Sequence, residues 1–136
     1  MDNISKNISY KEATFSNTAK ARKIDNTPSA DTLVRMKLVA EKCFQPVREW
    51  YGKPININSF YRSPLLNQAI RGAKTSQHVK GEAIDISAGS ATENKKLFDW
   101  LKDNVEFDQL INEYGFRWIH ISYKMNGNRN MVFNIN

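Results

Sequence analysis

The chain has 136 residues, of which 40% are hydrophobic and 25% are charged, and its formal net charge is +6. This length suits one domain with a single core and is too short for two ordinary domains. No run approaches about eighteen consecutive apolar residues, so no membrane span is predicted. The first residues, Met1 to Lys6, lack the charged and then apolar layout of a secretory signal.

The positive net charge indicates an acidic partner but does not identify one. The lysines and arginines are scattered and form no basic stripe, which disfavours nucleic acid. An anionic polymer such as a bacterial cell wall would satisfy the same electrostatics, and so would a merely solvated surface.

The first half of the chain is predicted to be mainly helical. Residues 1–25 are polar and weakly patterned, and we expect an arm with a short strand over 8–15. Thr27 and Pro28 predict a helix start, as the N-cap and the first helical residue. Pro46 is expected to kink this helix. Apolar residues spaced four and three positions apart predict the buried face of this helix, namely Met36, Ala40, Cys43, Val47 and Trp50. The thiol of Cys43 is therefore expected to be buried and unreactive.

The second half alternates strands with helices. Alternation of apolar and polar residues predicts strands over 55–61, 82–87, 107–114 and 117–123, with an edge strand over 131–135. Ser63 and Pro64 predict a short helix over 65–70, and Ser90 with Glu93 matches the capping box of another helix. This order predicts an α+β fold, with helices packed on one face of a small antiparallel sheet.

The only two histidines, His78 and His120, lie in segments predicted to border one face of this sheet. Asp85 and His120 alternate with isoleucines, so their side chains leave the apolar side of their strands and can converge. His78 lies in a predicted loop over 75–81 and can fold back over the Asp85 strand, because Gly81 allows a tight turn. Two imidazoles and a carboxylate are the minimum protein shell for Zn2+ with one position open. The pattern predicts a zinc site on the open face of the sheet, although each residue alone is more often structural.

Hydrolysis at such a site also needs a general base, and Glu113 is the best candidate. A two-residue turn at 115–116 would pair Glu113 with Trp118, and Glu113 would then share the face of His120. A three-residue loop would reverse this parity. The alternative is a solvated or ion-paired strand glutamate. Weaker candidates for the base are Asp108, which faces away from Glu113, and Glu82, which alternation places on the side of Ile84.

The spacing of these residues forms a specific motif, Ser76-x-His78-x-x-Gly81-x-Ala83-x-Asp85, followed by Trp118-x-His120. It resembles the M15 family of zinc D-Ala-D-Ala carboxypeptidases and related cell-wall endopeptidases. The resemblance to the small single-domain branch of phages and bacteria extends to Phe15-Ser-Asn-Thr-Ala, Asn26-Thr-Pro-Ser, Tyr61-Arg-Ser-Pro and Phe107-Asp-Gln-Leu-Ile. It covers most of the chain and implies one domain over 1–136.

The resemblance also implies roles for individual residues. The zinc ligands would be His78, Asp85 and His120. The substrate would be contacted by Arg62, Ser76, Gln77 and Trp118. Arg62 would stabilise a carbonyl oxygen or a carboxylate, the alternatives being a surface salt bridge for Arg62 and a loop cap for Ser76. Many relatives have the catalytic acid three residues before the last histidine, where this chain has Arg117, which cannot accept a proton. The catalytic role would then fall to Glu113.

We therefore expect a zinc metallopeptidase that hydrolyses peptidoglycan stem peptides, as a D-Ala-D-Ala carboxypeptidase or as an endolysin-like L-Ala-D-Glu endopeptidase. It would be a monomer that binds no nucleic acid and stays in the cytoplasm until it is released to the cell wall, or a virion component. One alternative is a non-catalytic, zinc-containing wall-binding module, which Arg117 supports. Another is a basic nucleic-acid-binding domain, which gives no reason for the His-Asp-His arrangement. The ligand set would also accept other first-row metals.

Overall fold

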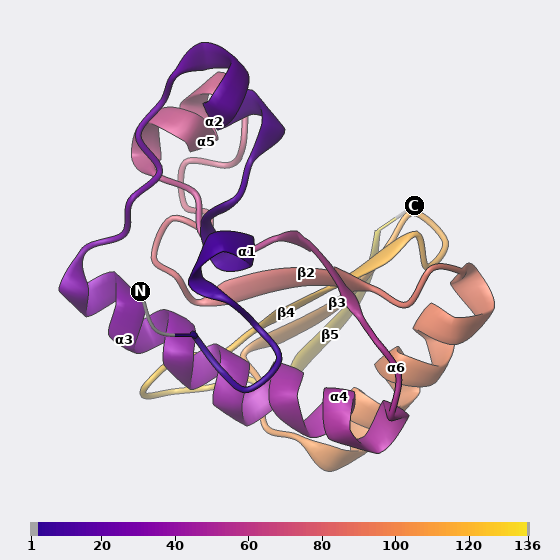
Figure 1. Cartoon of the computed structure of the whole chain (residues 1–136). Coiled ribbons are helices and arrows are strands. Elements are labelled where there is room, and N and C mark those ends of the chain that lie inside the picture. Colours follow the sequence, from indigo (N-terminus) through magenta and orange to yellow (C-terminus); the bar gives the residue numbers. More distant parts are fainter. Residues whose placement is uncertain (1–2, 136) are drawn as a thin grey trace.

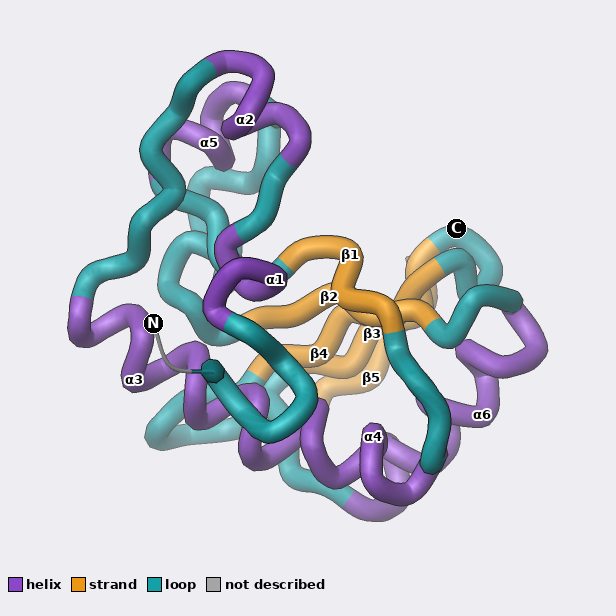
Figure 2. Tube along the Cα trace, viewed as in Figure 1, coloured by secondary structure: helices purple, strands orange, loops and turns teal. Residues whose placement is uncertain are grey.

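A five-stranded sheet with the strand order β1-β2-β4-β3-β5 forms the centre of the protein, whose computed structural model describes residues 3–135 (Figures 1 and 2). The strands are β1 (Asn56–Ser59), β2 (Ala83–Ser87), β3 (Gln109–Glu113), β4 (Trp118–Ser122) and β5 (Met131–Ile135). The helices are α1 (Tyr10–Thr14), α2 (Asn17–Arg22), α3 (Ala30–Val39), the π-helical η1 (Ala40–Phe44), α4 (Gln45–Tyr51), α5 (Pro64–Ala69) and α6 (Ala91–Asn104). The predicted α+β class is confirmed.

One face of the sheet is covered by α3, η1 and α4, which follow one another directly, and by α6 (Figure 1). The apolar side chains between these layers are fully buried, among them Met36, Val47, Ile84, Ile86, Leu97, Ile119 and Ile121. Cys43 is also buried, and burial raises the pKa of its thiol, as expected for an unreactive cysteine. Trp50 is 49% exposed, contrary to prediction, and stacks on Trp100 with 5.4 Å between ring centroids. No helix within residues 3–135 is long and apolar enough to cross a membrane.

The prediction of a polar arm with a strand over 8–15 was wrong. Two short helices, α1 and α2, occupy this segment instead. Ser9 forms a capping box with Glu12, and the Ser16 side chain accepts a hydrogen bond from the N–H of Ala19. Ile8 is fully buried, so the segment packs on the core rather than extending from it. Residues 1 and 2 of the predicted arm lie outside the described residues.

The first long helix begins two residues later than predicted and continues past its proline. Ser29, not Thr27, is the N-cap of α3, because the Ser29 hydroxyl accepts a hydrogen bond from the N–H of Thr32 at 3.2 Å. Pro46 lies in the first turn of α4, directly after the π-helical segment. Proline cannot donate a backbone hydrogen bond, and the wider π-turn before it lets the chain remain helical instead of breaking.

The sheet is mixed rather than purely antiparallel. The pairs β1–β2, β2–β4 and β3–β4 are antiparallel, but β5 runs parallel to β3. The chain leaves β4 beside the start of β3 and turns back there, where the N–H of Asn130 donates to the carbonyl of Phe107 at 2.9 Å. Because β5 then runs in the direction opposite to β4, and β4 is antiparallel to β3, β5 pairs with β3 in the parallel direction at the edge of the sheet. The edge strand over 131–135 was predicted, but its direction was not.

Candidate metal centre

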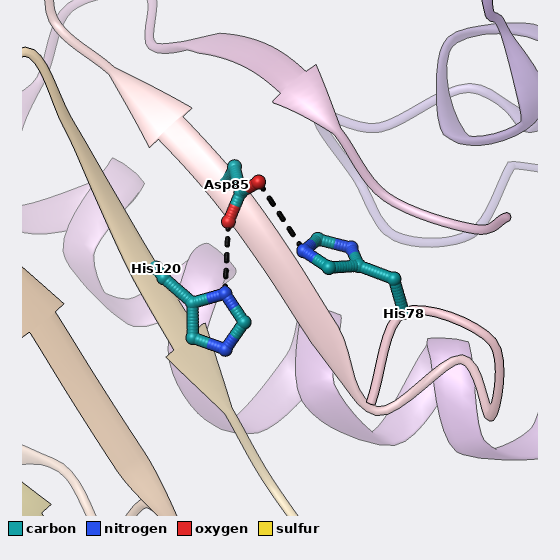
Figure 3. A group of neighbouring side chains, drawn as sticks. All are labelled: His78, Asp85 and His120. Atoms are coloured by element: carbon teal, nitrogen blue, oxygen red, sulfur yellow. Dashed lines mark hydrogen bonds and ion pairs between the residues drawn. The ribbon is translucent and has the colours of Figure 1, made fainter. Parts of the chain in front are cut away.

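Asp85 and His120 are directly opposite each other on neighbouring strands of the open face. The register of β2 against β4 pairs Asp85 with His120, and the isoleucines on either side of both residues point into the core. The Nδ1 atom of His120 lies 2.9 Å from Oδ1 of Asp85 (Figure 3). The prediction that alternation turns both side chains to the open face is therefore confirmed.

His78 reaches the same point from the turn before β2 (Figure 3). The residue is 2% exposed, and its Nδ1 atom lies 2.7 Å from the carbonyl oxygen of Phe60. Because a carbonyl oxygen only accepts hydrogen bonds, Nδ1 carries a proton, and the neutral form of the ring then presents the lone pair of Nε2. Nε2 has no hydrogen-bond partner within residues 3–135, and it faces Oδ2 of Asp85 at 3.2 Å.

This arrangement fits a divalent metal ion. One donor atom from each of His78, Asp85 and His120 lies within 4.8 Å of the others. A lone pair on Nε2 that faces a carboxylate oxygen is repelled unless a proton or a metal ion lies between the two atoms, and zinc ligands at about 2.0–2.2 Å in tetrahedral geometry are themselves about 3.3–3.6 Å apart. Burial acts to raise the pKa of Asp85, but the positive charge and hydrogen bonds of the two histidines in their protonated form outweigh it and hold this pKa well below its usual range. A bound metal ion would supply that positive charge in place of the protons. The carboxyl group is therefore ionised, as a metal ligand must be.

Gly81 shapes the turn that brings His78 to β2. Its φ is +74°, and an added Cβ would lie 2.8 Å from Cγ of Met36 and 2.9 Å from the carbonyl oxygen of Thr32. We expect Gly81→Ala to lower the free energy of unfolding by about 2–4 kcal/mol, because backbone strain and overpacking add. Urea denaturation would measure it. Gly52→Ala is the matched control, since Gly52 has a φ of +70° with no atom within 4 Å of the added Cβ, and it should cost about 1 kcal/mol. Equal losses would contradict the packing argument.

Arg62 is held beside the candidate ligands rather than on the surface. Its side chain is 15% exposed, and its Nη2 atom lies 3.9 Å from Oδ2 of Asp85. The guanidinium also donates to Asn67 Oδ1 at 3.1 Å and to Ser59 Oγ at 3.3 Å. Burial lowers the pKa of Arg62, and the carboxylates of Asp85 and Glu113 oppose this shift. The position of Arg62 is therefore fixed by three neighbouring side chains, and Arg62 lines the same cleft as the candidate ligands.

Glu113 lies on the face of His120, as the predicted pairing with Trp118 requires, although the turn spans residues 114–117 instead of two residues. The register pairs Glu113 with Trp118, and the indole Nε1–H of Trp118 donates to Oε2 of Glu113 at 2.6 Å. Arg117, at the position where many relatives have the acid, is exposed and does not line the site. Glu113, which lines the cleft with the candidate ligands, therefore remains the candidate for that role.

Two buried asparagines hold the turn that carries Glu113. Residues 114–116 all have φ between 54° and 68°, a conformation that L-residues rarely adopt. The side chain of Asn112 accepts from the N–H of Phe116 at 2.6 Å, and Asn94 of α6 donates to the Phe116 carbonyl at 2.8 Å. These contacts stabilise the turn and thereby the register of β3 against β4.

The site opens into a cleft of about 560 Å³. Its walls include all the residues predicted to contact substrate, namely Arg62, Ser76, Gln77 and Trp118, together with Glu113. Ser76 also has the structural role of a loop cap, because its hydroxyl accepts from the N–H of His78 at 3.2 Å. Glu82, Lys124 and Arg129 also line the cleft. Its volume lies in the range of small-ligand sites.

An ion pair between buried Asp108 and half-exposed Arg129, which the sequence did not reveal, supports the loop of His78. Asp108 is fully buried and accepts from Arg129 Nε at 2.9 Å and from Arg129 Nη2 at 2.8 Å. It also accepts from Gln77 Nε2 at 3.0 Å, which orients the residue before His78. The Phe60 carbonyl and Asn67 are further positioning groups that were missed. A backbone carbonyl carries no side-chain signal, and an isolated polar residue gives no pattern.

The Asp108–Arg129 pair predicts a pH dependence of stability. Hydrogen bonds from Arg129 lower the pKa of Asp108 from 3.8 to about 2. A lowered pKa contributes stability above about pH 4 that is lost as the pH falls through about 2, at most about 2 kcal/mol because solvent screens the half-exposed Arg129. We expect Asp108→Asn to be less stable than the wild type at pH 7 and nearly equal to it at pH 2. Denaturation at both pH values would measure this, and a constant difference would contradict it.

Comparison with known proteins identifies the family to which the chain belongs. A search of curated proteins finds no match. The model of one protein family, described as Peptidase M15, matches residues 6–122, which include the three candidate ligands, Arg62 and Glu113. The match covers most of the chain and agrees with the resemblance of the sequence motif. The chain therefore belongs to the Peptidase M15 family.

Proposed function

We propose that this protein is a zinc-dependent peptidase that cleaves peptidoglycan stem peptides. The family supports a metallopeptidase acting on substrates of the peptidoglycan type. The observation that carries the proposal further is the unpartnered Nε2 of His78, which faces Asp85 at 3.2 Å in a cleft shared with Glu113. The residues that would hold the ion are His78, Asp85 and His120.

The side chains around the ion site suit amide hydrolysis. A bound Zn2+ supplies Lewis-acid chemistry, polarising the scissile carbonyl and making water a better nucleophile at neutral pH. Glu113 takes a proton from the attacking water at its free carboxylate oxygen and gives it to the leaving amine. Trp118 holds the other oxygen and so fixes the direction of the carboxylate. Arg62 opposes the negative charge that develops on the carbonyl oxygen, or binds a substrate carboxylate.

Further features fit a cell-wall substrate. The net charge of +6 favours association with an anionic wall. The cleft is open and polar, as a site for an extended, charged peptide would be. The protein would act as a monomer, reaching the wall by release from the cytoplasm or as part of a virion.

A non-catalytic wall-binding module is the second candidate. The observation that favours it is Arg117, which stands where many relatives have the acid and cannot transfer a proton. Glu113 counts against it, because this carboxylate lines the cleft and is aimed by a hydrogen bond from Trp118.

Mass spectrometry of fragments released from defined peptidoglycan would test the proposal. The zinc-loaded protein is expected to release either D-alanine or fragments cut at one internal bond of the stem, and protein treated with a chelator should release neither. The mass of the product identifies the bond. Binding to peptidoglycan without any product from the zinc-loaded protein would favour the non-catalytic module.

A further inference from the structure

Glu82 is a buried residue whose carboxylate has one oxygen without a partner among the described residues. The residue is 8% exposed and lines the same cleft as His78, yet its Oε1 atom has no hydrogen bond within residues 3–135. No described lysine, arginine or histidine lies within ion-pair distance of it, although Lys80 and Lys124 line the same cleft. Its backbone is fixed, since its N–H donates to the backbone carbonyl of Gln77 at 3.0 Å and its own carbonyl accepts from the N–H of Tyr123 at 2.9 Å.

A second acceptor without a partner is contributed by Gln77. The Oε1 atom of its side-chain amide is buried and receives no hydrogen bond in the described part of the chain. Its Nε2 donates to Asp108 at 3.0 Å, so the amide cannot be turned round without placing an oxygen against a carboxylate. Glu82 and Gln77 both line the cleft, and each has a buried oxygen that requires a donor.

The chemistry of these two acceptors points to a cationic donor. An ionised carboxylate that is buried without a partner is costly, and a cation with several N–H groups removes that cost. A protonated amine has three donors, enough for Glu82 and Gln77 together. A second metal site is disfavoured, because the only group of at least three potential ligands among residues 3–135 is His78, Asp85 and His120.

We propose that Glu82 and Gln77 form a subsite for a protonated amine of the substrate. The inference rests on the proposed function, and it names the substrate group: the side-chain amine of the diamino acid in the stem peptide. Gln77 precedes His78 directly, so the subsite adjoins the candidate metal centre within one cleft. Recognition of this amine would set which residue of the stem lies across the metal. Glu82 is thus a specificity residue and takes no part in proton transfer.

Two stem peptides that differ only in acetylation of this amine would test the subsite. We expect the zinc-loaded wild type to cleave the free-amine peptide with a kcat/KM at least about tenfold higher. Glu82→Gln should abolish this preference by lowering kcat/KM for the free amine, with the acetylated peptide cleaved within about twofold of the wild type. Glu41→Gln, the same change at an exposed helical position, should keep the preference. Thermal unfolding and zinc content would establish that Glu82→Gln is folded and loaded.

The outcomes separate this inference from the proposed function. Equal cleavage of both peptides by the wild type, or a preference that survives in Glu82→Gln, would overturn the amine subsite and leave the peptidase intact. Absence of cleavage of every peptide would overturn the proposed function instead. Calorimetry would then decide the subsite alone: tighter binding of the free amine that depends on Glu82 supports it, and equal binding of the two peptides overturns it.

Discussion

Replacement of His120 by alanine is expected to remove zinc binding and peptidase activity together. The variant keeps only His78 and Asp85, too few ligands to hold zinc firmly in a site with an open position. We expect the zinc content after dialysis to fall from about one ion per chain to near zero, and kcat/KM to fall at least about a thousandfold, since the ion supplies several kcal/mol of transition-state stabilisation. Elemental analysis and peptide-cleavage kinetics would measure both.

The control for His120→Ala is the folded state of the variant. His120 is partly exposed and belongs to the open face rather than the core, so the circular dichroism spectrum should stay that of the wild type. Asp85 would lose its hydrogen bond to the ring, and a modest drop in melting temperature is expected. A folded variant that retains a full equivalent of zinc would place the metal elsewhere.

Glu113→Gln is expected to retain zinc and lose activity. Glutamine has the same shape, and its amide oxygen can still accept the hydrogen bond from Trp118, but it cannot take up a proton. Loss of general acid–base catalysis predicts a fall in kcat of about 10²- to 10⁴-fold, with zinc content unchanged. Steady-state kinetics on a stem peptide, with elemental analysis of the same sample, would measure both quantities.

The matched control for Glu113→Gln is Glu41→Gln, which removes the same charge from an exposed position outside the cleft. Its kinetics should equal those of the wild type. Activity of Glu113→Gln within about twofold of the wild type would assign proton transfer to another group. Together with His120→Ala, this variant separates metal binding from proton transfer. The non-catalytic alternative instead predicts no cleavage by the wild type or by either variant.

Strand alternation was the part of the sequence that predicted the site well. The isoleucines beside Asp85 and His120 must face the core, so the two polar side chains must leave it, and the register then made them direct neighbours. The same parity argument placed Glu113 correctly, because the strands around Gly115 have the register of a two-residue turn. An alternating pattern depends only on neighbouring residues, so it predicts which face of the sheet each side chain occupies in the folded protein.

Features that depend on contacts between distant segments were not predictable. The ring of His78 is oriented by the carbonyl of Phe60, eighteen residues away, and no side-chain pattern announces such a partner. Glu82 was expected on the side of Ile84, but its N–H bonds to Gln77 in the preceding turn, and the residue lines the cleft. The parallel direction of β5 likewise depends on where β4 ends relative to β3.

The prediction of a strand in the N-terminal segment was wrong for a different reason. Its helices are short, so periodicity has too few residues to show, and the caps at Ser9 and Ser16 carry most of the signal. Ile8 is buried by contacts with the rest of the fold. The Ser9–Glu12 capping box is the local pattern that favours a helix here, where a strand was predicted.

Titration of metal-free protein with Zn2+ tests the central claim most directly. Amine release from a stem peptide should be absent without metal, rise in proportion to added zinc and level off at one equivalent per chain, because one set of three ligands was found among the described residues. Full cleavage by the metal-free protein, or a site that fills with zinc without any cleavage of peptidoglycan, would contradict the assignment of this cleft as the active site of a zinc peptidase.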